Sequence, residues 1–554
     1  MDPAPVLVVG AGPVGMATAL ALARQGVPCV LADQHSETSV HPKLDYVNSR
    51  SMEFFRQLGI AGDIRAAGVA PRHPADVIWS TGLAGRPLTT WALPSVDEER
   101  RRIAADDDGT RPVEPGQRIS QIELEPVLRD HCRRSPLIDL RPGLRFDTLT
   151  QDDQGVTSSL SDVMTGGRTR IRSRYVIGCD GASSRVRTVL GIGEDGFGVP
   201  GLPGAFMVHF KSRDLGSLHR HGPFWHYFAF RYVVIAQDET DTWTVHVNAA
   251  HPDEFATPPA DPAAYLQEIL GTGLRIDKVL LTSRWRPGFM LADRYRAGRV
   301  LLAGDAAHRM FPTGAYGMNT GIGDAMDAAW KIAALVRHTG GPALLDSYET
   351  DRRPVGLRNM RTSHRHIGVH MKAGALLREG VPPDAVARFL DDERGENEYR
   401  GVELGYRYDD SPVVCPEDGP APGWSPAAYT PTTWPGSRPP SVLLADGSPL
   451  FDLFGAGFTL VDFAGDGRAG ALLRTAAAQG LPVRHAVVRD ARARELWERD
   501  LVLLRPDHHV AWRGNRTPAD PAAVVRRVRG AEPAGAGLPT AAGQPPFTFR
   551  CTNL

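Results

Sequence analysis

The chain has 554 residues, with 63 basic and 64 acidic side chains and a formal net charge of −1. Because the positive and negative charges nearly cancel, the protein has no net charge that would attract nucleic acid or an anionic membrane, and neither is expected as a partner. Hydrophobic residues make up 42% and charged residues 23%, which excludes disordered and fibrous classes, and the length is sufficient for two or three domains.

The chain opens with the pattern of a βαβ unit. Short apolar strands are predicted at 6–9 and 28–32, and an apolar helix at 16–25 lies between them. The intervening loop reads G-x-G-x-x-G from Gly10 to Gly15, and Asp33 closes the second strand 18 residues after Gly15. Strand, glycine loop, helix and acidic residue together predict a dinucleotide-binding site on a parallel sheet.

Each glycine of this loop has its own predicted task. Gly10 permits the tight turn, Gly12 lets the backbone approach a pyrophosphate, and Gly15 lets the helix pack on the strand. The helix N-terminus attracts the phosphates, and Asp33 accepts a hydrogen bond from a ribose hydroxyl. The motif alone does not separate NAD from FAD.

Segment 6–23 is apolar enough to suggest a signal peptide or a short membrane span. Asp2 stands where a basic residue is expected before such a segment, and glycines interrupt it, so the dinucleotide interpretation is preferred. The cysteines form no C-x-x-C pair and no metal-ligand spacing, which predicts no metal site and favours a reducing cytoplasm. They are Cys29, Cys132, Cys179, Cys415 and Cys551.

Further elements follow in chain order. A helix is predicted at 49–58, and the stretch 205–250 alternates β-branched and aromatic residues with polar ones, as an antiparallel sheet does. A strand at 299–303 leads into a second glycine-rich loop. Long helices are predicted at 321–336 and from 342 to about 377.

Two further motifs resemble those of class A FAD-dependent aromatic hydroxylases, the p-hydroxybenzoate and phenol hydroxylase type of flavoprotein monooxygenase. Asp180-Gly181, within Tyr175–Arg187, is similar to the D-G motif that this family links to FAD and NAD(P)H. Gly304-Asp305 followed by Pro312–Asn319 is similar to the G-D motif, whose aspartate binds the ribitol or ribose side of FAD and whose glycine-rich stretch surrounds the isoalloxazine. With the glycine loop, three motifs occur in the family's order.

The resemblance implies FAD as cofactor and NADPH or NADH as transient co-substrate. Gln121 looks like the family glutamine that contacts the FAD pyrophosphate, and Lys43 stands where many relatives carry an arginine, so it offers charge without a bidentate fork. A helix N-terminus aimed at the flavin would stabilise the negative charge of its reduced form. The FAD-binding residues so predicted are Gly10, Gly12, Pro13, Val14, Gly15, Asp33, Lys43, Gln121, Asp180, Gly304, Asp305, Pro312, Gly317, Met318 and Asn319.

The substrate side is predicted less directly. Asp45 lies five residues before Arg50, as the catalytic aspartate does in phenol hydroxylase relatives, so it is the candidate for assisting phenol deprotonation. The alternative is a surface or capping aspartate. Candidate substrate-binding residues, which could equally be plain structural residues, are Tyr46, His226, Tyr227 and His246.

The C-terminal third contains a Pro/Gly-dense linker and a smaller α/β unit. Gly465–Gly470 also matches G-x-G-x-x-G, but charged Asp466 and Arg468 would crowd a phosphate loop. Leu450–Gly455 and Leu504–Arg513 instead resemble the thioredoxin-like C-terminal domain of phenol and polyketide hydroxylase relatives. Without C-x-x-C this domain has no thioredoxin chemistry, and the Ala/Gly/Pro-rich tail 530–546 is predicted to be poorly ordered.

The predicted fold is therefore α/β: a Rossmann-like FAD-binding domain of glutathione-reductase type with an inserted, mostly antiparallel substrate-binding sheet, plus a thioredoxin-like C-terminal domain. A hydroxylase module occupies 1–400, a linker 401–445 and the C-terminal domain 446–554. Within the module we expect FAD segments at about 1–75, 110–195 and 290–345, the substrate sheet at about 76–109 and 200–288, and helices at 342–400.

The leading functional prediction is hydroxylation of a phenolic ring with NAD(P)H and O₂ through a C4a-hydroperoxyflavin, on a polycyclic aromatic polyketide in a biosynthetic pathway. Baeyer–Villiger oxygenation of a polyketide ketone and hydroxylation of a simple monocyclic phenol stay open, as does a homodimer. A flavin-binding scaffold without turnover is a third class, and it would not need the motif proposed to surround reduced flavin.

Overall fold

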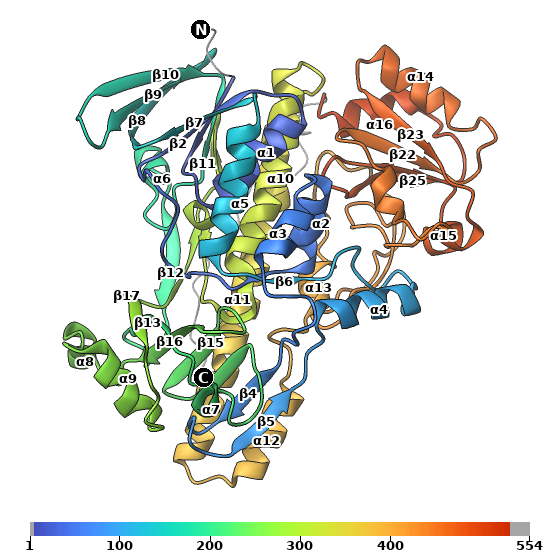
Figure 1. Cartoon of the computed structure of the whole chain (residues 1–554). Helices are drawn as coiled ribbons and strands as arrows, with labels where there is room; N and C mark the ends of the chain where they lie inside the picture. Colours follow the sequence, from blue (N-terminus) through green and yellow to red (C-terminus); the bar gives the residue numbers. More distant parts are fainter. Residues whose placement is uncertain (1–4, 532–554) are drawn as a thin grey trace.

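The structure is a computed structural model that describes residues 5–531 (Figure 1). The predicted tail at 530–546 therefore lies almost wholly outside the described residues, as does Cys551. None of the helices in the described part of the chain is long and apolar enough to cross a membrane.

A six-stranded sheet forms the base of the N-terminal domain within these residues. Its first two strands are parallel, almost entirely buried and joined by helix α1 (Pro13–Arg24), as the βαβ pattern predicted. Helices α5 (Gln121–Arg134) and α10 (Tyr316–Val336) pack against α1. The sheet order is β19 (Arg296–Ala297), β20 (Val300–Leu302), β11 (Tyr175–Gly178), β1 (Val6–Val9), β2 (Cys29–Asp33) and β7 (Ile138–Pro142).

Smaller sheets and short helices extend this domain. Their strands are β8 (Leu144–Asp152), β9 (Gly155–Asp162) and β10 (Arg168–Ser173); β12 (Glu194–Gly198), β18 (Gly288–Ala292) and β21 (His308–Arg309); and β3 (Tyr46–Val47) with β6 (Gln117–Arg118). The helices are α2 (Ser49–Gln57), α3 (Ala61–Ala67), α4 (Val96–Asp106) and α6 (Arg185–Val189), with 3₁₀ turns at Gly304–Ala306 and Thr313–Ala315.

A seven-stranded sheet lies beside this domain, at the lower end in Figure 1. All its pairs are antiparallel except β14 with β4. Two of its strands come from the segment before α5 and the rest from a later insertion. The order is β17 (Lys278–Trp285), β13 (Ala205–Lys211), β16 (Thr242–Asn248), β15 (Tyr232–Ala236), β14 (His226–Ala229), β4 (Val77–Ser80) and β5 (Pro87–Trp91).

The two faces of this sheet have different partners. One face packs its apolar side chains on α9 (Pro262–Leu270), in a core that contains Tyr227 and Trp243. Strand register places Met207, His246 and His226 on the opposite face, which we call the site face. Helices α11 (Ala343–Arg378) and α12 (Pro383–Asp392) cover the β4 end of it, while α7 (Leu215–Leu218) and α8 (Pro252–Ala256) are short connections.

The C-terminal domain has a four-stranded sheet with thioredoxin connectivity. The strand order is β23 (Val483–Val487), β22 (Phe458–Asp462), β24 (Leu501–Leu504) and β25 (Val510–Gly514). Strand β22 pairs in parallel with β23 and antiparallel with β24, and β24 pairs antiparallel with β25. The helices are α14 (Gly470–Ala478), α15 (Ala491–Leu496) and α16 (Pro521–Val528), and a 3₁₀ turn spans Leu450–Leu453. With this domain, the predicted fold class is confirmed.

The Gly465–Gly470 loop of that domain, as the structure describes it, offers no phosphate cradle. Asp462 accepts hydrogen bonds from the backbone N–H groups of Ala464 and Gly465, and Arg468 pairs with Asp466 across the loop. The loop's own side chains thus take up its donors and charges.

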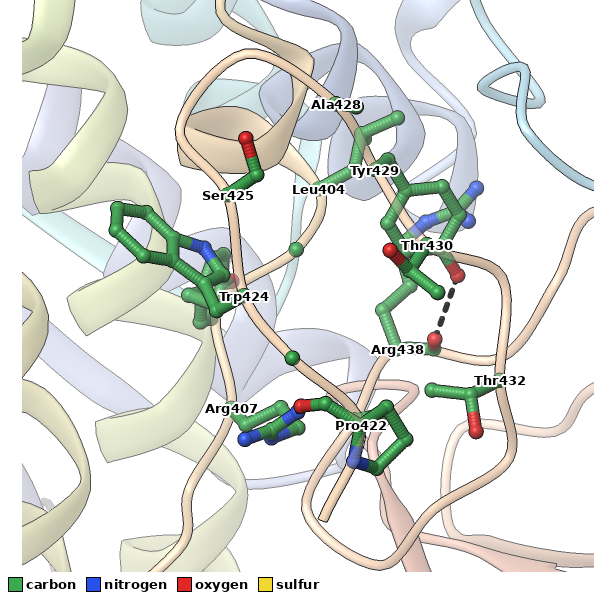
Figure 2. Close-up of a pocket in the computed structure, with 14 residues that line it drawn as sticks. Leu404, Arg407, Pro422, Trp424, Ser425, Ala428, Tyr429, Thr430, Thr432 and Arg438 are labelled. Carbon is green, nitrogen blue, oxygen red and sulfur yellow. Dashed lines mark hydrogen bonds between the residues drawn. The ribbon is translucent and has the colours of Figure 1, made fainter.

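The interdomain segment, predicted as a linker at 401–445 with a Pro/Gly-dense stretch at 412–440, is well packed. It contains α13 (Arg400–Glu403) and buries Tyr406, Tyr408 and Thr433. Figure 2 shows a crevice in this segment, where the Tyr429 hydroxyl donates to the Arg438 carbonyl oxygen at 2.7 Å. Its volume of about 10 Å³ is room for one water at most, so it is not a substrate site.

Candidate active site

The glycine loop after β1 contains two glycines that packing requires and one that it does not. A Cβ on Gly10, whose φ is +99°, would lie 2.4 Å from the Cys179 carbonyl oxygen, and one on Gly15 would lie 1.8 Å from the Gly10 oxygen. A Cβ on Gly12 would meet no atom within 4 Å among the described residues, and the Gly12 backbone (φ −72°, ψ −178°) suits any residue. The protein itself therefore has no need of glycine at Gly12, which fits a ligand that approaches there.

The N-terminus of α1 beside Gly12 is prepared for an anion. No side chain caps this helix, and Pro13 occupies its first turn. Asp33 at the end of β2 accepts from the Ala11 N–H at 2.5 Å and from the His35 N–H at 2.7 Å, so its carboxylate is held at the mouth of the loop. Open space, free helix N–H groups and an adjacent carboxylate fit the pyrophosphate and ribose of FAD.

The other two motifs meet this loop. The Gly304 position lies against Val14, where a Cβ would come within 3.0 Å, and Arg187 of the D-G motif donates to the Ala306 carbonyl oxygen at 2.9 Å. The Asp180 carboxylate accepts from the Ser184 hydroxyl and the Val186 N–H, so it holds the start of α6. Segments almost 300 residues apart thus converge at one place.

Asp305 faces solvent, although protein surrounds it. Burial raises the pKa of its carboxyl group, while His308, Lys43 and Arg309 act in the opposite direction. Asp305 is thus an accessible carboxylate that nearby protein desolvates, and Lys43, also exposed, is near enough to favour its ionised form.

The segment from Lys43 to Asn48 runs between the predicted FAD residues. Its Leu44 and Asp45 carbonyl oxygens accept from the N–H groups of Gln121 and Ile119, both at 3.0 Å. Asn319 holds the other end, because its Oδ1 accepts from the Asn48 N–H at 3.0 Å and its Nδ2 donates to the Tyr46 carbonyl oxygen at 3.2 Å.

The first turn of α10 carries the predicted flavin stretch. Ala315 precedes it with φ +53°, and no side chain within residues 5–531 caps the helix, so its first N–H groups are available to a ligand. Gly317 and Met318 lie in this turn, and a Cβ on Gly317 would have only Met310 at 3.9 Å. Pro312 begins the 3₁₀ turn before it. The positive helix end fits the negative charge of reduced flavin.

Asp45 is held by two donors from the site face. His226 Nε2 lies 2.7 Å and Trp225 Nε1 3.0 Å from the same oxygen, Oδ2. Burial opposes ionisation of Asp45, but His226, the Trp225 hydrogen bond and Arg118 outweigh it, so the pKa of Asp45 is lowered. Oδ1 has no hydrogen-bond partner among the described residues. The carboxylate is thus ionised and able to accept one more proton or hydrogen bond.

The candidate substrate residues divide between the two faces of the sheet. His246 lies on the site face with its Nδ1 accepting from Trp285 Nε1 at 3.1 Å, and burial lowers the pKa of His246 to about 4. Trp285 packs on Phe311, next to Pro312, with ring centroids 5.6 Å apart. The site face therefore reaches from Asp45 to the predicted flavin stretch.

Tyr227 does not share that face. Strand alternation turns its side chain into the α9 core, where it is fully buried and its hydroxyl donates to the Gly82 carbonyl oxygen at 3.1 Å. The sequence interpretation of Tyr227 as a substrate contact is therefore corrected, since the side chain points away from the site.

Tyr46 lines a cavity of about 310 Å³ behind the Asp45 segment. Its ring packs on Trp225 with centroids 5.0 Å apart, and burial raises the pKa of its hydroxyl. Trp225, which donates to Asp45, lines the same cavity, so Tyr46 lies in the wall of a cavity beside the candidate catalytic group.

Sequence reasoning missed several residues that shape the site. Glu125 accepts from Gln121 Nε2 at 2.6 Å and from the Ser39 N–H, so it orients the predicted pyrophosphate contact. Glu396 accepts from the Gly314 N–H at 3.3 Å, and Trp225 binds Asp45. Only Glu125 left a signal, because it lies one helical turn after Gln121 on the same face.

The comparisons with known proteins agree with this geometry. Residues 3–363 match the FAD binding domain family, and residues 432–531 match the family of aromatic-ring hydroxylase C-terminal domains. FAD-dependent monooxygenase apdD of Emericella nidulans is 40% identical, over 93% of this chain and 88% of its own length. Tetracenomycin B2 monooxygenase-dioxygenase of Streptomyces olivaceus is 34% identical, over 94% and 97%.

Solved structures give the same result over nearly the whole chain. The rebeccamycin biosynthetic enzyme RebC with reduced flavin has a TM-score of 0.84 at 33% identity, covering 96% of this chain and 99% of that one. Aklavinone-11 hydroxylase, in a ternary complex with FAD and aklavinone, has a TM-score of 0.79 at 29% identity, covering 95% and 99%. The family resemblance drawn from the three motifs is thereby confirmed, and the chain belongs to the FAD-dependent aromatic-ring hydroxylases.

Proposed function

We propose that this enzyme hydroxylates a polycyclic phenol of aromatic polyketide type, with NADPH or NADH and O₂ as co-substrates, and that Asp45 is its catalytic base. The observation that carries the proposal is the Asp45 carboxylate, held ionised by His226 and Trp225 with one oxygen unpartnered among the described residues. An ionised carboxylate with a vacant oxygen accepts a hydrogen bond from a phenol and takes up its proton as the ring reacts, which makes the ring more electron-rich.

FAD, reduced by NAD(P)H, supplies the oxidant formed with O₂ when it is bound. The residues proposed to hold it are the glycine loop with Asp33 at the pyrophosphate and ribose, Gln121, Lys43 and Asp305 along the linkage, and the first turn of α10 at the flavin ring. The protein's remaining task is to hold the phenol against that ring and to exclude water.

The site face supports a large planar substrate. His226 and Phe228 lie on this face of β14, and His246 and Trp285 lie on it towards Phe311. This spread of aromatic and imidazole rings offers stacking surface to fused rings. Two similar proteins are named for tetracenomycin B2 and aklavinone, which supports the same substrate class here.

The test is to follow NAD(P)H oxidation under air with mono- and polycyclic phenols, and to characterise products by mass and NMR. A polycyclic phenol that accelerates NADPH loss and gains one oxygen on its ring supports the proposal. An ester or lactone product would instead indicate Baeyer–Villiger chemistry, and preference for monocyclic phenols would assign a different substrate class. A homodimer and a cytoplasmic location remain predictions, for light scattering and fractionation to test.

A further inference from the structure

A tight turn of the C-terminal domain enters the hydroxylase module. It comprises Arg505–His509 between β24 and β25, and we call it the docking turn. The His508 N–H donates to the Arg505 carbonyl oxygen at 2.9 Å, and the Arg505 N–H donates to the His509 carbonyl oxygen at 2.8 Å. His508 has φ +62°, an unfavourable conformation for a residue with a side chain, and its ring is packed edge-on between Phe451 and Phe454. These hydrogen bonds and the packing of the His508 ring hold the backbone of the turn in a defined conformation.

Arg505 joins two helices of the hydroxylase module through buried ion pairs. Its guanidinium lies 2.6 Å from Asp327 of α10 and 2.9 Å from Asp351 of α11, and Lys331 lies 2.7 Å from both carboxylates. Asp507 of the turn binds the same guanidinium at 2.7 Å. All five side chains are at most 1% exposed, so any relative movement would leave a charge unpaired in the interior.

The backbone of the docking turn holds a third helix, α2. Arg50 in the first turn of α2 donates to the Asp507 carbonyl oxygen at 2.9 Å, and Gln57 at its end donates to the Pro506 carbonyl oxygen at 2.7 Å. Figure 1 shows α2 and α10 on the side of the module that faces the C-terminal domain. The turn thus holds α2 at both ends and α10 at its middle, where Asp327 lies.

These helices begin at the candidate active site. The N-cap of α2 is Asn48, which Asn319 of α10 ties to the Asp45 segment. A second connection runs through Tyr408, whose ring lies 4.3 Å from that of His509 and whose hydroxyl accepts from Arg352 at 3.1 Å.

Arg352 continues this connection into the flavin stretch. It donates to the Thr320 carbonyl oxygen at 2.9 Å and to Asp324 at 2.8 Å. Asp324 in turn accepts from the Gly304 N–H at 3.1 Å. The docking turn is therefore linked by continuous contacts to Thr320, directly after the flavin stretch, and to Gly304 of the Gly304-Asp305 motif.

We propose that the docking turn sets the geometry of the flavin site from the C-terminal domain, and that Arg505 is a positioning residue for the hydroxylation reaction. The role in hydroxylation rests on the proposed function, while the role in FAD binding does not. Arg505 contacts none of the predicted FAD-binding residues and does not contact Asp45, so it acts through α10, α11 and α2. A simple stabilising role would instead lower the melting temperature and leave the flavin environment of the folded enzyme unchanged.

The experiment compares Arg505→Lys with the wild-type full-length enzyme. Lysine keeps the charge but lacks the fork that reaches Asp327 and Asp351 together. The readouts are the FAD dissociation constant from titration of apoprotein, the visible circular dichroism of bound FAD, amide hydrogen exchange at 320–324, and product formed per NADPH consumed.

Two controls separate positioning from stability. Arg494→Lys changes a partly exposed arginine of the same domain, which pairs with Asp500 at 2.5 Å and lies outside the docking turn. Val461→Ala makes a cavity in the core of the C-terminal domain and lowers the melting temperature. Both controls are expected to keep wild-type flavin dichroism and product per NADPH in the folded enzyme.

For Arg505→Lys we expect the FAD dissociation constant to rise by about 5-fold or more, since about 5-fold is the lower end of the usual coupling between distant sites. We also expect faster exchange at 320–324, altered flavin dichroism and less product per NADPH. Gln57→Met, which removes only the contact with Pro506, should shift the same readouts by less, and it provides the test if Arg505→Lys does not fold. Unchanged affinity, dichroism and exchange in the folded variants would overturn the proposal. These three readouts need no substrate, so they stand even if no phenol is hydroxylated.

Discussion

Replacement of Gly12 by alanine should weaken FAD binding without harming the apoprotein. A Cβ there meets no protein atom within 4 Å, and the backbone conformation is ordinary for alanine. Reduced freedom of the unfolded chain should stabilise the variant by about 0.4–1 kcal/mol, while alanine is a poorer N-cap than glycine. These effects nearly cancel, so the free energy of unfolding of the apoprotein should change by less than about 0.5 kcal/mol.

The same methyl group occupies the space proposed for the pyrophosphate. Overpacking of a fitted contact costs about 1–3 kcal/mol, which corresponds to FAD binding weaker by about 5- to 150-fold. The assay is titration of apoprotein with FAD, followed by flavin fluorescence, together with urea unfolding of the apoprotein. Gly15→Ala is the matched control: its Cβ would lie 1.8 Å from the Gly10 oxygen, so it should destabilise the apoprotein itself. Wild-type FAD affinity in Gly12→Ala would refute the placement of the pyrophosphate.

The remaining predictions concern the substrate side. The Asp45→Asn variant should retain FAD but hydroxylate about 10²- to 10⁴-fold more slowly, because it lacks the proposed base. Single-turnover kinetics measure this rate. An unchanged rate would show that Asp45 has no part in the mechanism. Burial lowers the pKa of His246 to about 4 in the native state, whereas its ordinary value is about 6.5. As pH falls, the unfolded state therefore takes up this proton before the native state does, so the free energy of unfolding decreases between about pH 6.5 and pH 4. NMR of the labelled imidazole checks this, and titration near pH 6.5 would contradict it. Tyr227→Phe should cost about 0.5–1.5 kcal/mol of stability through the lost bond to Gly82, while the hydroxylation rate stays at the wild-type value; a large rate loss with normal FAD binding would return Tyr227 to the site.

The FAD half of the site could be predicted from sequence because its determinants are local. The roles of Gly10 and Gly15 follow from a strand, a turn and a helix that adjoin in the chain, and the structure gives both the close contacts expected. The predicted helix at 49–58 is likewise present as α2, with Asn48 as its cap. Periodicity and capping residues are sufficient for such elements.

The substrate half depends on register, which sequence patterns do not specify. Adjacent residues of a strand face opposite sides, so a choice between His226 and Tyr227 needs the position of the whole sheet. Trp225 lies just before β14, where alternation gives no guidance, yet its indole reaches Asp45. Arg505 meets Asp327 across 178 residues, and no local pattern announces such a pairing. The Pro/Gly composition of 412–440 likewise did not reveal how much of the interdomain segment is buried.

The two faces of the seven-stranded sheet bear on how such enzymes acquire new substrates. The α9 face supplies the apolar core that holds the strands together, whereas the site face carries the residues that would meet a ligand. Exchanges at partly exposed positions of the site face, such as His246, therefore change the outline of the binding surface while the α9 core beneath the sheet keeps its packing. Natural variation and laboratory evolution alike can thus remodel selectivity here with little penalty in foldability, which makes these positions a natural starting library.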